Sequence, residues 1–85
     1  MKEFVHIIAD PEGIHARPAG MLLKEATKYS AKITLDKDGK QGDAKRIFAI
    51  MALGAKRGDT LKVTVEGEDE EEAAAALEIF LKENL

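Results

Sequence analysis

The stretch Thr60-Leu61-Lys62-Val63-Thr64-Val65-Glu66 alternates polar and apolar residues without a break. Side chains of a β-strand point alternately to the two faces of a sheet. This period of two therefore predicts a strand whose Leu61, Val63 and Val65 face a core. The polar residues of the same strand then face solvent, which indicates a sheet that is covered on one face only.

Three further strands are predicted. Residues Glu3 to Ile8 are rich in β-forming side chains, and Lys32 to Asp36 alternate again. Asp38-Gly39 predicts a hairpin turn of type I′, because that turn needs a positive φ at both central residues. The short polar segment Lys40 to Asp43 would return from the turn as an edge strand, since lysines and short length are typical of edges.

Helical periodicity predicts two of the three helices between and beyond these strands. The first runs from Ala16 to about Lys28, and its apolar side chains recur at helical spacing at Ala19, Leu22, Leu23 and Ala26. The last begins near Asp69, with Glu72 as a capping-box partner. Its predicted buried stripe is Ala73, Ala76, Leu77, Phe80 and Leu81.

A short apolar segment, Ile47 to Leu53, is predicted to be a helix that ends at Gly54, since glycine readily adopts the left-handed conformation of a helix terminus. The resulting order is β-α-β-β-α-β-α. It predicts an α+β domain of two layers, an antiparallel sheet with helices on one face. The pattern leaves the order of the strands in the sheet open.

Composition sets limits on function. The chain has 85 residues, no cysteine and a net charge of −3, and we expect one domain over residues 1–85. The lack of cysteine excludes disulfide scaffolds and suits the cytoplasm. We expect no signal peptide at Met1-Lys2-Glu3 and no membrane-spanning segment. The segment from Glu66 to Glu72 holds six of the sixteen acidic residues, so the rest of the chain carries a net charge of +3. For this basic part of the chain, an acidic protein surface is a better partner than nucleic acid.

The segment Gly13-Ile14-His15-Ala16-Arg17-Pro18-Ala19 could carry chemistry. Pro18 fits the first turn of a helix, which places His15 at or just before the helix start. The backbone amides of Ala16 and Arg17 then have no acceptor within the helix and can bind an anion. Arg17 adds a planar set of donors suited to phosphate, and a neutral imidazole is a nucleophile. This arrangement favours phosphorylation of His15, although His15 could instead be a plain cap residue.

Two helix faces indicate a docking surface. The outer face of the first helix combines basic residues with a methionine and lies beside a glycine. These residues are Arg17, Lys24 and Lys28, then Met21, and Gly20 beside them. If Ile50 and Leu53 of the short helix point inward, helical geometry turns Phe48, Met51 and Ala52 outward, with Ile47 at the boundary. His6 lies in mid-strand and could face either side of the sheet, and we interpret it as structural.

These segments, together with Asp38-Gly39-Lys40, Ala44-Lys45, Met51-Ala52-Leu53-Gly54 and Gly67-Glu68-Asp69-Glu70, resemble the HPr family of bacterial histidine phosphocarrier proteins. The resemblance covers essentially the whole chain. It implies an open-faced β-sandwich with a four-stranded antiparallel sheet and three helices on one face.

The resemblance also implies a function. His15 would accept a phosphoryl group through Nδ1 from phosphorylated enzyme I and pass it to enzyme IIA domains in sugar uptake, with Arg17 stabilising the group. It implies a cytoplasmic monomer that needs no cofactor or metal and is not a self-contained enzyme. The alternatives are a regulatory binding module that docks on other proteins, or a carrier in a nitrogen-related or dihydroxyacetone system.

One position departs from some relatives. Where low-GC Gram-positive members of the family carry a regulatory serine after an Ala-Lys pair, this chain has Arg46. We therefore expect no regulation by a serine kinase.

Overall fold

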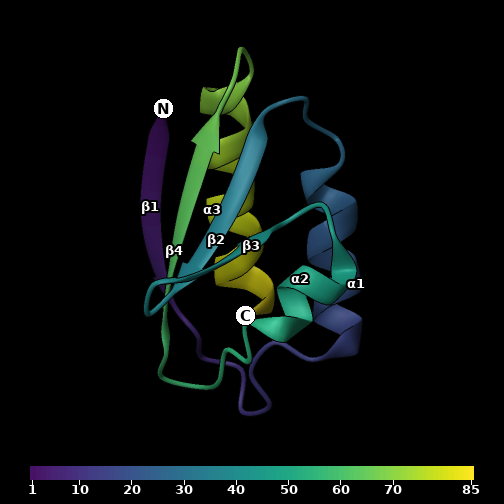
Figure 1. The fold of residues 1–85 in the computed structure, drawn as a ribbon, viewed down its shortest axis with the longest axis vertical. Coiled ribbons are helices and arrows are strands. Elements are labelled where there is room, and N and C mark those ends of the chain that lie inside the picture. The colour runs from purple at the N-terminus through teal and green to yellow at the C-terminus, as the bar shows by residue number, and fades with distance from the viewer.

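The computed structural model describes residues 1–85 as four strands and three helices in the predicted order. The strands are β1 (Lys2–Ile7), β2 (Lys32–Lys37), β3 (Lys40–Asp43) and β4 (Thr60–Glu66), and every pairing between them is antiparallel. The order in the sheet is β1-β4-β2-β3, which places β4 between β1 and β2 (Figure 1). The predicted α+β architecture is confirmed.

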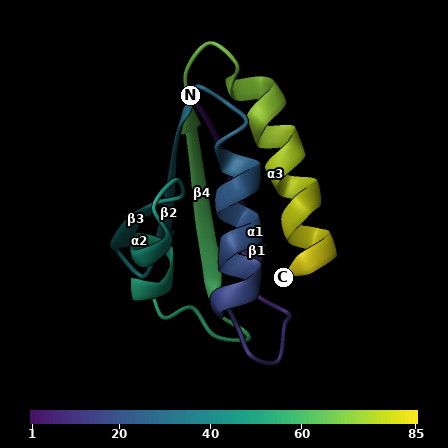
Figure 2. The ribbon, with the colours of Figure 1, turned by 90° about the vertical axis from the view of Figure 1, so that its right-hand side faces the viewer.

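The helices are α1 (Ala16–Ala26), α2 (Ile47–Ala52) and α3 (Glu70–Asn84). Figure 2 shows α1 and α3 side by side along one face of the sheet. The first helix ends two residues earlier than the sequence predicts. Thr27 closes it with an amide bonded to the carbonyl of Leu23, and its hydroxyl donates to the carbonyl of Lys24.

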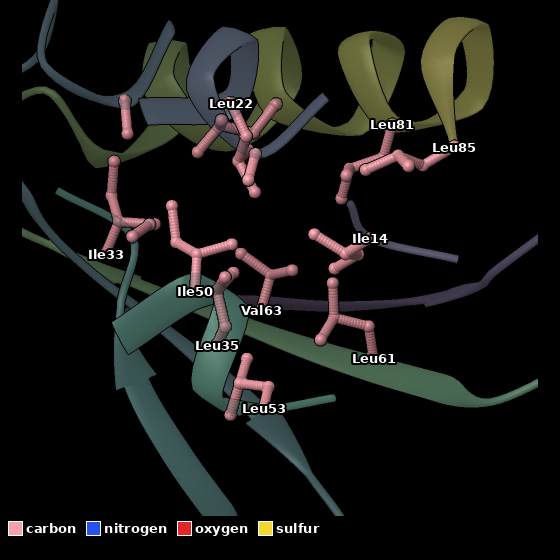
Figure 3. Packing of buried hydrophobic residues seen from close by; sticks show 14 of the residues in the cluster. Ile14, Leu22, Ile33, Leu35, Ile50, Leu53, Leu61, Val63, Leu81 and Leu85 are labelled. Carbon is pink, nitrogen blue, oxygen red and sulfur yellow. The ribbon is translucent and has the colours of Figure 1, made fainter. Parts of the chain in front are cut away.

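The core lies between the sheet and the helices, and every buried side chain that forms it is apolar. Leu61, Val63 and Val65 of β4 are fully buried, as their alternation predicts. Leu22 of α1, Ile50 of α2 and Leu81 of α3 meet this strand from the helical layer (Figure 3). Burying a large aliphatic side chain contributes about 1.5–3 kcal/mol, so these contacts are the main source of stability.

The structure also shows how the predicted turn, His6 and the predicted apolar stripes are arranged. The turn at Asp38-Gly39 has φ values of 53° and 85°, which confirms positive φ at both central residues. His6 lies opposite Leu61 in the register of β1 and β4, so it faces the helical layer. Its Nε2 is buried and has no hydrogen-bond partner. In the predicted apolar stripes, Leu23, Ala76 and Phe80 are partly rather than fully buried.

The predicted capping box at the start of α3 is wrong. Asp69 is the residue before the helix, but its side chain makes no capping hydrogen bond. Its carboxylate accepts instead from the amides of Ser30 (2.8 Å) and Ala31 (2.9 Å), in the loop between α1 and β2. Glu70, rather than Glu72, reaches back to the amide of Gly67 at 3.1 Å. Two tertiary bonds to a distant loop replace the local cap.

These bonds predict a pH-dependent contribution to stability. The hydrogen bond from the Ser30 amide, reinforced by that from Ala31, holds the pKa of Asp69 below its usual value. The folded state therefore binds the Asp69 proton less readily than the unfolded state. The stabilisation of the folded state by these two hydrogen bonds is present above the pKa of about 3.9 that Asp69 has in the unfolded state. It is lost as the pH falls through the lower pKa that Asp69 has in the folded state.

We expect Asp69→Asn to lower the urea midpoint at about pH 7, and the difference from the unmodified protein to shrink below about pH 4. Glu68→Gln, which removes a neighbouring exposed charge, is the control and should leave the midpoint almost unchanged. A difference between Asp69→Asn and the unmodified protein that stays constant down to acid pH would contradict this account.

Candidate functional site

The start of α1 is fixed by a close contact between two backbone segments. Gly13 has φ +69°, and a Cβ at this position would lie 2.8 Å from the Cα of Lys56 and in collision with the carbonyl oxygen of Ala55. The next amide, that of Ile14, donates to this same Ala55 carbonyl at 3.0 Å. Only glycine allows the approach, because a side chain would need both a left-handed backbone and space that is already filled.

His15 directly follows this contact and is the N-cap residue of α1. Its backbone is extended, with φ −112° and ψ −176°, and its side chain makes no capping bond. Its carbonyl accepts the amide of Ala19 at 3.0 Å, which begins the helical bonding. The imidazole is 39% exposed and is thus accessible from the surface.

The amides of Ala16 and Arg17 belong to the first turn, and no acceptor within the protein is found for either. Both residues are exposed. The positive end of the helix dipole adds to these free donors, and the Arg17 guanidinium forms no ion pair with a carboxylate. The structure therefore brings together the residues that the sequence predicted for anion binding.

Sequence reasoning missed the acids beside His15. Asp10 Oδ2 lies 3.7 Å and Glu12 Oε2 lies 3.4 Å from His15 Nε2. The sequence indicated only a turn at these positions, although Glu12 precedes His15 by three residues. A shallow depression of about 270 Å³ adjoins the imidazole, and its lining residues are Asp10, His15, Arg17, Pro18, Met21 and Asn84. No group of three or more His, Asp or Glu side chains is arranged to hold a metal ion.

The predicted docking residues form an exposed surface on α1 and α2. Phe48 is 85% exposed, while Ile50 and Leu53 are buried, as the helical angle predicts. Met21, Lys24, Met51 and Ala52 are exposed as well, and Ile47 is partly buried. A Cβ built on Gly20 would meet nothing within 4 Å, so this glycine leaves open space above the helix. Lys28 differs from Lys24 because it pairs with Glu25 at 3.1 Å.

The two basic residues before α2 have different roles. Lys45 Nζ donates to the carbonyl oxygen of Tyr29, just beyond the end of α1, at 2.6 Å. The Lys45 ammonium group is therefore engaged in a hydrogen bond within the protein. Arg46 is the N-cap residue of α2, is exposed and forms no ion pair. Of the two, only the Arg46 side chain is thus unpaired, next to the predicted docking residues of α2.

Comparison with known proteins places this geometry in a family. Residues 2–83 match the family described as PTS HPr component phosphorylation site. The Phosphocarrier protein HPr of Mycoplasma genitalium is 42% identical over 85 residues, which covers 99% of this chain and 97% of that protein. The HPr-like protein Crh of Halalkalibacterium halodurans is 40% identical over 82% of this chain and 83% of its own.

A solved structure with a similar sequence identity to this chain has the same fold. A crystal structure of HPr from Thermoanaerobacter tengcongensis superposes with a TM-score of 0.94 at 42% identity, and covers 99% of this chain and 94% of that chain. A four-stranded sheet with three helices is thus the architecture of the family as well as of this chain.

The contact at Gly13 predicts that adding a single methyl group at this position lowers the stability of the protein. We expect Gly13→Ala to destabilise the protein by about 2 kcal/mol or more, because the new Cβ adds backbone strain and overlaps Ala55. Urea unfolding measures this change, and amide spectra should show the largest shifts around Ile14 and His15.

Gly54→Ala separates the two causes. Gly54 has φ +62°, close to that of Gly13, but a Cβ there would meet nothing within 4 Å. This control should show only the milder effect of left-handed strain. Equal destabilisation by both substitutions would mean that the close approach to Ala55 is unimportant.

Proposed function

Because the chain belongs to the PTS HPr family, we propose that it is a phosphocarrier in which His15 accepts a phosphoryl group and passes it on. The observation that carries this proposal is the position of His15. An exposed imidazole lies at the amino end of α1, beside two free amides and an unpaired guanidinium. The proposed donor is phosphorylated enzyme I, and the proposed acceptors are enzyme IIA domains in sugar uptake.

The chemistry follows from these groups. The lone pair of the imidazole attacks phosphorus, a nitrogen–phosphorus bond forms, and the bond to the donor atom breaks with its electron pair left on the donor. The amides of Ala16 and Arg17 and the Arg17 side chain can stabilise the phosphoryl oxygens. The open depression supports the group without enclosing it, so that a second partner can take it up.

The docking surface supports the same proposal. It combines the apolar Phe48, Met51 and Met21 with the cations of Arg17, Lys24 and Arg46. Adaptable methionines suit a surface that must fit several partners, and cations favour partners with acidic faces. We propose that the protein acts as a cytoplasmic monomer without cofactor or metal. None of the three helices combines the length and the apolar character that a membrane span requires.

A regulatory binding module without transfer is the less favoured function. Such a module needs the docking surface but neither His15 nor the free amides beside it, and the chain has all of these. The segment from Lys45 to Leu53 contains no serine or threonine, so α2 offers no hydroxyl to a serine kinase. We propose transfer through His15 as the main activity.

The proposal predicts a single phosphorylated histidine. After incubation with enzyme I and labelled phosphoenolpyruvate, the unmodified protein should carry an acid-labile phosphoryl group, and His15→Ala should carry none. His6→Ala is the control and should be labelled, because His6 faces the helical layer. Labelling of His15→Ala at the level of the unmodified protein would contradict the assignment.

The docking surface predicts the effect of removing its largest apolar side chain. We expect Phe48→Ala to weaken binding to enzyme I by about 1–3 kcal/mol, as for an interface anchor, when binding is measured by calorimetry. Ile79→Ala removes another exposed apolar side chain, 58% exposed and on α3. It should leave affinity unchanged, and an equal loss for both variants would argue against docking through α2.

A further inference from the structure

We propose that Asp10 and Glu12 are positioning residues that hold the ring proton of His15 on Nε2, so that Nδ1 keeps its lone pair for phosphoryl transfer. Both carboxylates approach Nε2, at 3.7 Å and 3.4 Å. An ionised carboxylate attracts an N–H hydrogen and repels a nitrogen lone pair, so at these distances it favours electrostatically the tautomer with the proton on the nitrogen that faces it. The consequence for transfer rests on the proposed function, whereas the position of the proton does not.

Asp10 is held in place on several sides. Its Oδ1 accepts the amide of Glu12 at 2.8 Å, and its backbone carbonyl accepts the amide of Gly13 at 2.9 Å. Its own amide donates to the carbonyl oxygen of Leu85 at 3.1 Å. With one carboxylate oxygen and the backbone fixed, Oδ2 is left to face the ring.

The two acids are expected to contribute unequally. Glu12 is nearer to Nε2, but its side chain is 73% exposed, and exposed ion pairs are weakened by solvent. Asp10 is only 24% exposed and is anchored by the turn. Asp10 should therefore hold the proton more strongly, and Glu12 should add to it.

The charged groups around the imidazole are not paired with one another. Asp10 and Glu12 both lie within 4 Å of Nε2, whereas Arg17, which lines the depression together with Asp10, forms an ion pair with neither acid. A phosphoryl group carries negative charge, so repulsion from the carboxylates disfavours its attachment at Nε2. Attachment at Nδ1 places the phosphoryl group farther from both carboxylates, which lessens this repulsion, and Arg17 is free to bind the phosphoryl oxygens.

The proton then stays on one atom through the whole cycle. With hydrogen on Nε2, the Nδ1 lone pair forms the bond to phosphorus, and the phosphorylated ring gains a positive charge that the two carboxylates stabilise. In the onward transfer the nitrogen–phosphorus bond breaks and its electron pair returns to Nδ1. No proton has to enter or leave the ring in either step.

The ¹⁵N spectrum of the histidine rings tests the inference in the unphosphorylated protein. At about pH 8.5, where an unperturbed imidazole is neutral, the two nitrogens report which one carries hydrogen. We expect the proton of His15 on Nε2 in the unmodified protein. In the double variant Asp10→Asn with Glu12→Gln, the fraction with hydrogen on Nδ1 should rise several-fold. Glu12→Gln alone, which leaves the turn intact, should give a smaller rise.

The matched control is the double variant Glu68→Gln with Glu72→Gln. It removes the same charge from exposed positions at the start of α3, at the end of the molecule opposite to the loop before α1 (Figure 1). His15 should keep its tautomer there, and His6 serves as a reference in every sample. The rate of labelling by enzyme I should fall several-fold in the Asp10 and Glu12 double variant and stay unchanged in the control.

The outcomes separate the two claims. If the Asp10 and Glu12 double variant has the tautomer populations of the unmodified protein, the inference is overturned, even where His15 is labelled normally. If the tautomer shifts but the unmodified protein is never labelled, the proposed function is overturned and the position of the proton stands.

Discussion

The close approach of Gly13 to the backbone of Ala55 sets where α1 begins, and the candidate site depends on that position. Because the Ile14 amide bonds to the Ala55 carbonyl, the chain enters the helix at His15 with the amides of Ala16 and Arg17 still free. A start shifted by one residue would turn the imidazole away from those donors. The arrangement of His15 and the free amides is thus a consequence of backbone packing.

The same contact helps to hold the proposed docking surface. Ala55 lies just after α2, so its bond to Ile14 joins the end of α2 to the start of α1. At the other end, Lys45 before α2 bonds to the carbonyl of Tyr29 beyond α1. The two helices are therefore tied together at both ends, and the proposed docking surface has a shape that is already set. A preformed surface loses less entropy on binding than one that must first become ordered.

Most of the fold could be predicted from local patterns. The alternation in β4, the Asp38-Gly39 turn and the outward angle of Phe48 each depend on neighbouring residues, which sequence periodicity describes well. Contacts between distant segments could not be predicted in this way. The order of the strands, the bonds from Asp69 to Ser30 and Ala31, and the orientation of His6 all depend on packing. For the site, the sequence indicated its donors but not the carboxylates that surround Nε2.

The central claim is that the amides at the start of α1 bind a phosphoryl group carried by His15. Its most direct test is the ¹H–¹⁵N spectrum of the phosphorylated protein, recorded together with the ³¹P signal. The account predicts a nitrogen–phosphorus bond at Nδ1 and the largest downfield amide shifts at Ala16 and Arg17. Unmoved amides at these two positions, or a phosphoryl group on Nε2, would contradict it.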